Sequence, residues 1–149
     1  MTFTLSSPDF SDGSPIPPRH TCDGEDVSPA LSWEGAPEGT ESLALILDDP
    51  DARGFAHWVL FDVAPGATGD LPAGLAASPD APPQGLNGFG RPGYAGPCPP
   101  SGSHRYVFAL YALDTLLGLP GAPRADEVRQ AMRGHLLAEA RLTGSYRRS

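Results

Sequence analysis

The sequence predicts a mostly β fold, an antiparallel sandwich with one or two peripheral helices near the C-terminus. Several runs alternate apolar and polar residues, for example residues 2–7 and 138–148, and this period of two is typical of half-buried strands. The 18 glycines and 18 prolines lie between dense apolar runs such as LALIL and YVFALYAL, where they are expected to form turns. The length of 149 residues fits a single domain, residues 1–149.

Each strand is predicted from a short run that ends at a turn residue. The buried run 42–48 stops before Pro50, because proline cannot donate to a β-ladder. Residues 64–103 are rich in proline and glycine and are expected to form a long loop, which in a small domain is usually functional. A helix is expected over 123–136, with a proline near its start, acidic residues in its first turn and a glycine near its end. The predicted strands are 2–7, 30–35, 42–48, 56–63, 104–113 and 138–148.

The charge and the N-terminal sequence exclude several classes of protein. A formal net charge of −8 repels phosphate backbones and anionic lipid surfaces, so we expect no nucleic-acid partner. An anion site would have to be a local pocket of donors. The sequence MTFTLSSPDF lacks the basic and apolar regions of a signal peptide, and no apolar run approaches the roughly 20 residues that span a bilayer. We therefore expect a cytoplasmic protein that is not integral to a membrane.

The two cysteines, Cys22 and Cys98, show neither a CxxC pattern nor metal-ligand spacing. In a reducing cytosol two free thiols are expected. A bridge would close a loop of about 76 residues and stabilise the fold by roughly 4–5 kcal/mol on the chain-entropy argument. The spacing alone does not decide between the two states.

An acidic cluster, Asp48, Asp49 and Asp51, follows the predicted strand 42–48. Three carboxylates so close together repel one another unless a positive group faces them. One interpretation is a turn in which an aspartate caps its own backbone. Another is that one carboxylate orients a histidine or an arginine. A hard-cation site is disfavoured, because such a site needs roughly six oxygen ligands.

Histidines open two of the predicted strands. His57 shares a strand face with Val59 and Phe61 if alternation is regular, and by itself this position favours a structural role at the edge of the core. Alternation also places His104 and Tyr106 side by side on one face of the strand 104–113. Arg105 then points to the opposite face, where we expect it to pair with a carboxylate.

Catalytic motifs are weak by comparison. The sequence PPSGSHRY is not a Gly-x-Ser-x-Gly nucleophile elbow, and neither a P-loop nor a Rossmann fingerprint is present. The two histidines lack local metal-ligand spacing, which disfavours a metal triad. We therefore predict no metal and no cofactor, and we favour binding over catalysis.

Three segments together resemble the signatures of the phosphatidylethanolamine-binding protein family, also called Raf-kinase-inhibitor-like proteins. These segments are DDPDA with FAHWVLFDV, NGFGRPGYAGPCPP, and GPCPPSGSHRYVFALYAL. The segments HTCDGEDVSPALSW and RGHLLAEARLTGSY resemble the small bacterial and archaeal branch. The resemblance extends over almost the whole chain and implies a Greek-key sandwich in which a large antiparallel sheet packs on a smaller one, with an anion pocket at one end.

The resemblance also implies which residues form that pocket. Cys98 stands where eukaryotic members have a glycine, and Arg53 stands where the family's DPDAP motif has its final proline. The arginine is expected either to add a phosphate donor at the rim or to be solvated. The sequence ends soon after Tyr146, so we expect no flanking C-terminal helix and a more open rim. The implied ligand-binding residues are Asp49, His57, Gly96, Cys98, His104 and Tyr106, and the implied supporting residues are Pro50, Asp51, Pro99, Pro100 and Arg105.

From these residues we expect a binding and regulatory protein with a pocket for a phosphate or a phospholipid head group. Asp49 is expected to accept a proton from an imidazole and so fix its tautomer. Binding should then strengthen as the pH falls through about 6.5, the reference value for histidine. The expected protein partner is a kinase or a protease, and we also expect a homodimer. The alternatives are a hydrolase that uses an Asp-His-Tyr cluster and a protease inhibitor that acts through an exposed loop.

Overall fold

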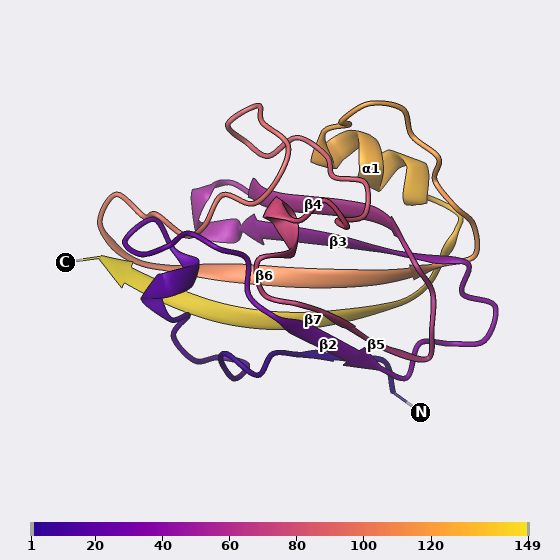
Figure 1. Cartoon of the computed structure of the whole chain (residues 1–149), viewed down its shortest axis with the longest axis horizontal. Helices are drawn as coiled ribbons and strands as arrows, with labels where there is room; N and C mark the ends of the chain where they lie inside the picture. Colours follow the sequence, from indigo (N-terminus) through magenta and orange to yellow (C-terminus); the bar gives the residue numbers. More distant parts are fainter. Residues whose placement is uncertain (1, 149) are drawn as a thin grey trace.

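The computed structural model describes residues 2–148 as two antiparallel sheets, one α-helix and three short 3-10 helices (Figure 1). The small sheet has the strand order β1-β2-β5, and the large sheet has the order β4-β3-β6-β7. This arrangement confirms the predicted fold class. The strands are β1 Thr4–Ser6, β2 Leu31–Glu34, β3 Ser42–Asp49, β4 Phe55–Val63, β5 Thr68–Leu71, β6 Gly102–Leu113 and β7 Leu136–Arg148; the helices are η1 Pro18–His20, η2 Pro50–Ala52, η3 Leu75–Ala77 and α1 Ala125–Met132.

The main core lies between the two sheets. Alternate residues of β6 enter it, namely Tyr106, Phe108 and Leu110, and all three are fully buried. β3 is buried on both faces, which explains its almost continuous apolar sequence. Burial of each large apolar side chain contributes about 1.5–3 kcal/mol, so this core is the main source of stability. It fixes the strand ends on which the site is built.

The opposite face of the large sheet is covered by α1. Val128 and Met132 of the helix are buried in one cluster with Ile46 and Phe61. The helix is shorter than the predicted range 123–136. It ends at Met132 because Arg133 is extended and Gly134 has a left-handed backbone, with φ of 82°.

The stretch 64–103 contains a strand that the sequence did not predict. β5 pairs with β2, with Leu71 opposite Leu31 and Gly69 opposite Trp33. Its sequence, TGDL, contains a single apolar residue, so no alternation is visible. The glycine is required by packing: a Cβ at Gly69 would lie 2.2 Å from the Trp33 ring.

The rest of this stretch runs beside β4 and is bonded to its free edge. The amide N–H groups of Gly85, Gly88 and Ala95 donate to carbonyl oxygens of β4, at 2.9, 2.7 and 2.9 Å. The loop therefore supplies the partners that an edge strand would otherwise lack. It also brings Ala95 to the first residues of β4, where the Ala95 N–H donates to the His57 carbonyl oxygen.

The expectation of two free thiols is wrong in this structure, because Cys22 and Cys98 form a disulfide. Their Cα atoms lie 5.4 Å apart, although the residues are 76 positions apart in sequence. Neighbouring bonds hold the same two loops together: the Cys22 N–H donates to Pro97 O at 3.2 Å, and the Tyr94 hydroxyl donates to His20 O at 2.6 Å.

Among the described residues, no helix has the length and apolar character needed to cross a membrane.

Candidate functional site

A pocket of about 170 Å³ opens where β3, β4 and β6 meet at one end of the large sheet. Five of the six predicted ligand-binding residues line it, and Gly96 does not. The predicted supporting residues Pro99 and Pro100 also line it. The complete lining is Asp49, Ala52, Phe55, His57, Phe89, Cys98, Pro99, Pro100, His104 and Tyr106.

Asp49 is the fixed acceptor at the base of the pocket. Its side chain is almost fully buried, and each carboxylate oxygen has one donor: the Asp51 N–H at 2.8 Å and His104 Nδ1 at 2.6 Å. The first bond begins the 3-10 turn η2. The second places the proton of His104 on Nδ1, because an ionised carboxylate only accepts. Asp49 thus orients the imidazole, as the sequence predicts.

His57 is held in the same tautomer by a backbone group. Its Nδ1 donates to the carbonyl oxygen of Ala95 at 2.6 Å, and its own carbonyl accepts the Ala95 N–H at 2.9 Å. The ring is buried, and the resulting desolvation lowers the pKa of His57 below 6.5 despite the opposing charge of Asp49. The neutral ring therefore dominates at pH 7.

The prediction that His57 shares a face with Val59 and Phe61 is wrong. The register between β3 and β4 slips at this point, where Leu47 faces Trp58 but Asp48 faces Ala56. His57 is the extra residue of this bulge, which re-aims its side chain. Its ring lies 5.3 Å from the Tyr106 ring on the inter-sheet side, whereas Val59 and Phe61 pack on the face that α1 covers.

Tyr106 forms the floor between the two imidazoles. Its ring is fully buried, meets His57 edge-on and stacks with His104 at a centroid distance of 6.4 Å. Burial, reinforced by the negative charge of Asp49, raises the pKa of Tyr106 far above its usual value of 10.0. Its hydroxyl is therefore neutral and able to donate a hydrogen bond.

Arg105 points out of the pocket and pairs with Asp51, as predicted. The Asp51 carboxylate accepts Arg105 Nη2 at 2.9 Å, Nε at 3.2 Å and the backbone N–H at 2.8 Å. These bonds lower the pKa of Asp51 to about 2. They also join the 3-10 turn η2 to the start of β6, so that Asp49 and His104 keep their relative positions.

One wall of the pocket comes from the loop that precedes β6. Cys98, Pro99 and Pro100 contact the pocket directly. The N–H of Gly96 instead donates to the Asp26 carboxylate at 2.9 Å. A Cβ at Gly96 would lie 2.4 Å from the His20 carbonyl oxygen, so this glycine permits close contact between two loops. Arg53 is exposed and lies outside the lining.

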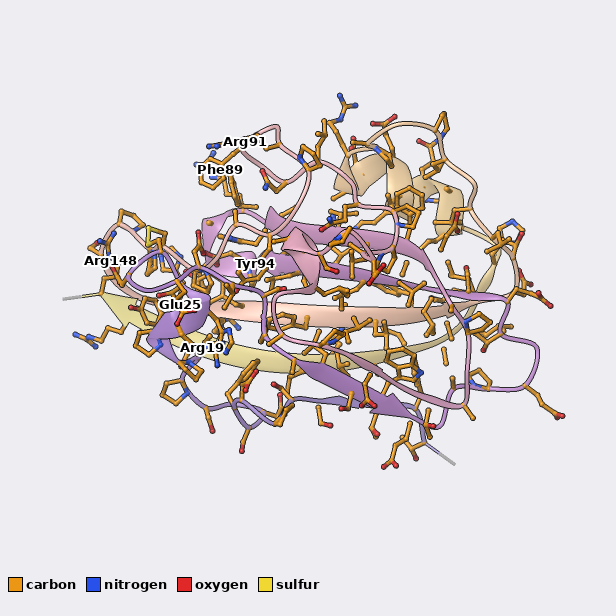
Figure 2. The ribbon with its side chains drawn as sticks, in the orientation of Figure 1. Arg19, Glu25, Phe89, Arg91, Tyr94 and Arg148 are labelled. Carbon is orange, nitrogen blue, oxygen red and sulfur yellow. A yellow bond between two sulfur atoms is a disulfide. The ribbon has the colours of Figure 1, made fainter. Side chains whose placement is uncertain are left out.

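Two aromatic residues of the pocket were missed at the sequence level. Phe55, at the start of β4, lies beneath Phe89, which belongs to the loop along the β4 edge. The available signal was the sequence Asn-Gly-Phe-Gly, a turn that carries an exposed aromatic residue. Figure 2 shows Phe89 and Arg91 together near the tip of this loop. Among residues 2–148, no three His, Cys, Asp or Glu side chains are grouped so as to hold a metal ion.

Comparison with known proteins gives consistent results. The family described as phosphatidylethanolamine-binding protein matches residues 6–147. A UPF0098 protein of Methanothermobacter thermautotrophicus is 53% identical over 152 residues, which covers 98% of this chain and 99% of the relative.

Solved structures agree with that match. The chain superposes on the phosphatidylethanolamine-binding protein homologue CT736 of Chlamydia trachomatis with a TM-score of 0.91 and 38% identity, covering 99% of each chain. It also superposes on YbcL of E. coli, which is described as a new member of the mammalian PEBP family, with a TM-score of 0.89, 30% identity and coverage of 100% of both chains.

Proposed function

The chain belongs to the phosphatidylethanolamine-binding protein family, and on that premise we propose that it binds small oxyanions of the phosphate type through His57 and His104. Such an anion can be a free phosphate, a phospholipid head group or an anionic group on a partner protein. In this role the protein is a binding and regulatory module, acting on a partner such as a kinase or a protease.

One observation carries this proposal: both pocket imidazoles use Nδ1–H on a fixed acceptor. His104 donates to Asp49, and His57 donates to Ala95 O. Nε2 is then the nitrogen left for a ligand, and it donates only when the ring is protonated. Two imidazolium rings beside the neutral hydroxyl of Tyr106 would form a donor set suited to an oxyanion.

This arrangement couples anion binding to proton uptake. The pKa of His57 is below 6.5 in the free protein, so its charge appears only as the pH falls below that value. A bound anion favours the charged ring. Affinity should therefore be weak at pH 8 and increase as the pH falls through 6.5 and below.

Calorimetric titration with sulfate tests the proposal, because sulfate does not titrate in this range whereas phosphate does. Affinity should increase at least tenfold from pH 8 to pH 5.5, with proton uptake seen as a heat that depends on the buffer. His57→Ala and His104→Ala should each remove most of the binding. His135→Ala is the matched control, since His135 pairs with Asp114 and lies outside the pocket lining. Sulfate affinity that is independent of pH and of both pocket histidines would refute the proposal.

Two other functions would give different results in parallel assays. A hydrolase would turn over generic phosphate or acyl esters, and His57→Ala would abolish the turnover. A protease inhibitor acting through residues 64–103 would lose inhibition on loop changes but not with His104→Ala. The hydrolase would use the same oriented imidazoles as general acid or base, so the turnover assay, and not the tautomer, separates it from anion binding.

A further inference from the structure

We infer that Phe89 is a specificity-determining residue, which selects organic anions that carry an aryl or similarly large apolar group next to the oxyanion over anions that lack one. This inference rests on the proposed anion pocket and adds the class of ligand. It follows from where Phe89 lies, what holds it and what the rest of the pocket offers.

Phe89 is a large apolar side chain that is 59% exposed, yet it lines the pocket. Its ring meets Phe55 edge-on at a centroid distance of 4.9 Å, and Phe55 meets His57 in the same way at 5.0 Å. His57 in turn meets the fully buried Tyr106 at 5.3 Å. The exposed ring is thus the outermost of four rings that lead from the surface to the floor of the site.

The ring stands on an ordered turn. The Phe89 N–H donates to the Asn87 side-chain oxygen at 2.9 Å, and the Asn87 N–H donates to Arg91 O at 2.8 Å. Gly88 lies directly on Phe55, since a Cβ there would be 2.4 Å from that ring. A ring already held in place loses little freedom when a ligand covers it, so contact with it adds to affinity.

The lining of the pocket divides into a polar base and apolar walls. Asp49, His57 and His104 provide the charged and titratable groups at the base, and the ring of Tyr106 contacts both imidazoles. The walls are Ala52, the two phenylalanines, the disulfide-bonded Cys98, and Pro99 and Pro100. An inorganic anion would use only the base, and the walls would contribute nothing to its binding.

A ligand whose oxyanion carries an aryl group or an alkyl group much larger than methyl would use both parts. Its anionic end would meet the imidazoles, and its apolar group would contact Phe55 and Phe89. Aromatic contact of this kind is worth a factor of about three to ten in affinity. Phe89 would then lose part of its exposure to water when the ligand binds.

Calorimetry with phenyl phosphate and methyl phosphate at pH 5.5 tests the inference, since the two esters share one anionic group. The wild-type protein should bind phenyl phosphate about three to ten times more tightly than methyl phosphate. Phe89→Ala should remove most of this preference and leave the affinity for methyl phosphate unchanged. Phe89→Tyr should keep the preference.

Leu116→Ala is the matched control, because Leu116 is equally exposed at 62% and lies outside the pocket. It should change neither affinity. Two outcomes would overturn the role of Phe89: equal affinities of the wild-type protein for the two esters, or equal weakening of both by Phe89→Ala. If binding still depends on His104, the proposed anion site would stand in either case. Binding of phenyl phosphate that survives His104→Ala would instead overturn the proposed anion site.

Discussion

Reduction of the Cys22–Cys98 disulfide is expected to destabilise the protein strongly. The bridge closes a segment of 76 positions that contains β2, β3, β4 and β5. In the reduced unfolded chain this segment is unconstrained. Reduction therefore raises the conformational entropy of the unfolded state far more than that of the folded state.

The magnitude follows from the length of the closed segment. Closing a loop of this size removes roughly 15 cal/mol/K of chain entropy, or about 4.5 kcal/mol at 25 °C. With an m-value of about 2 kcal/mol/M in urea, the unfolding midpoint should fall by about 2 M. The bonds from Tyr94 to His20 O and from Gly96 to Asp26 remain, so the two loops should stay in contact in the native state.

Urea denaturation with and without a phosphine reductant measures this change. A Cys22→Ser/Cys98→Ser variant should unfold at the lower midpoint under both conditions, which separates loss of the bridge from other effects of the reductant. Unfolding of the wild-type protein at the same urea concentration in both states would refute the reasoning. It would mean that the reduced unfolded chain already holds these loops together.

Three further changes test other parts of the structure. Arg105→Met should lower the free energy of unfolding, measured by urea titration, by an amount that is constant above pH 4.5. This loss should shrink between pH 4 and 2. The reason is that Arg105 lowers the pKa of Asp51 to about 2, and the pairing is lost in the wild-type protein as the carboxyl is protonated. Gly144→Ala should cost about 1–3 kcal/mol of unfolding free energy, since the new Cβ would lie 2.5 Å from the buried Ile16 side chain; an unchanged urea midpoint would contradict this. Asp49→Asn should weaken sulfate binding about tenfold in calorimetry. The Asn side chain can still accept the Asp51 N–H, but it no longer carries a negative charge beside the His104 imidazole. Undiminished affinity would rule out the role of Asp49 in orienting His104.

Regular alternation explains which parts of the site could be predicted. β6 is a long strand without a bulge before its last residues, so the period of two placed His104 and Tyr106 on one face and Arg105 on the other. The same reasoning failed for His57. The bulge in β4 depends on how the strand pairs with β3, and no local pattern of apolar residues reports such a slip.

The features that sequence reasoning missed depend on contacts between distant segments. The disulfide requires that the loops around Cys22 and Cys98 meet, and their proximity is set by the packing of the two sheets. The place of Phe89 at the pocket depends on the hydrogen bonds that hold its loop against β4. Composition identified that loop as unusual but gave no information on its path.

The loop bonded along β4 has a consequence for self-association. A second copy cannot extend the large sheet at that side, because the main-chain groups of β4 are already occupied. On the other side, residues 13–16 bond to Thr143 and Ser145 at the end of β7. Among the described residues of these two edges, extension into a continuous intermolecular sheet is thereby limited to residues 136–141 and 146–148. A homodimer would therefore have to join through one of these short stretches of β7 or through faces and loops.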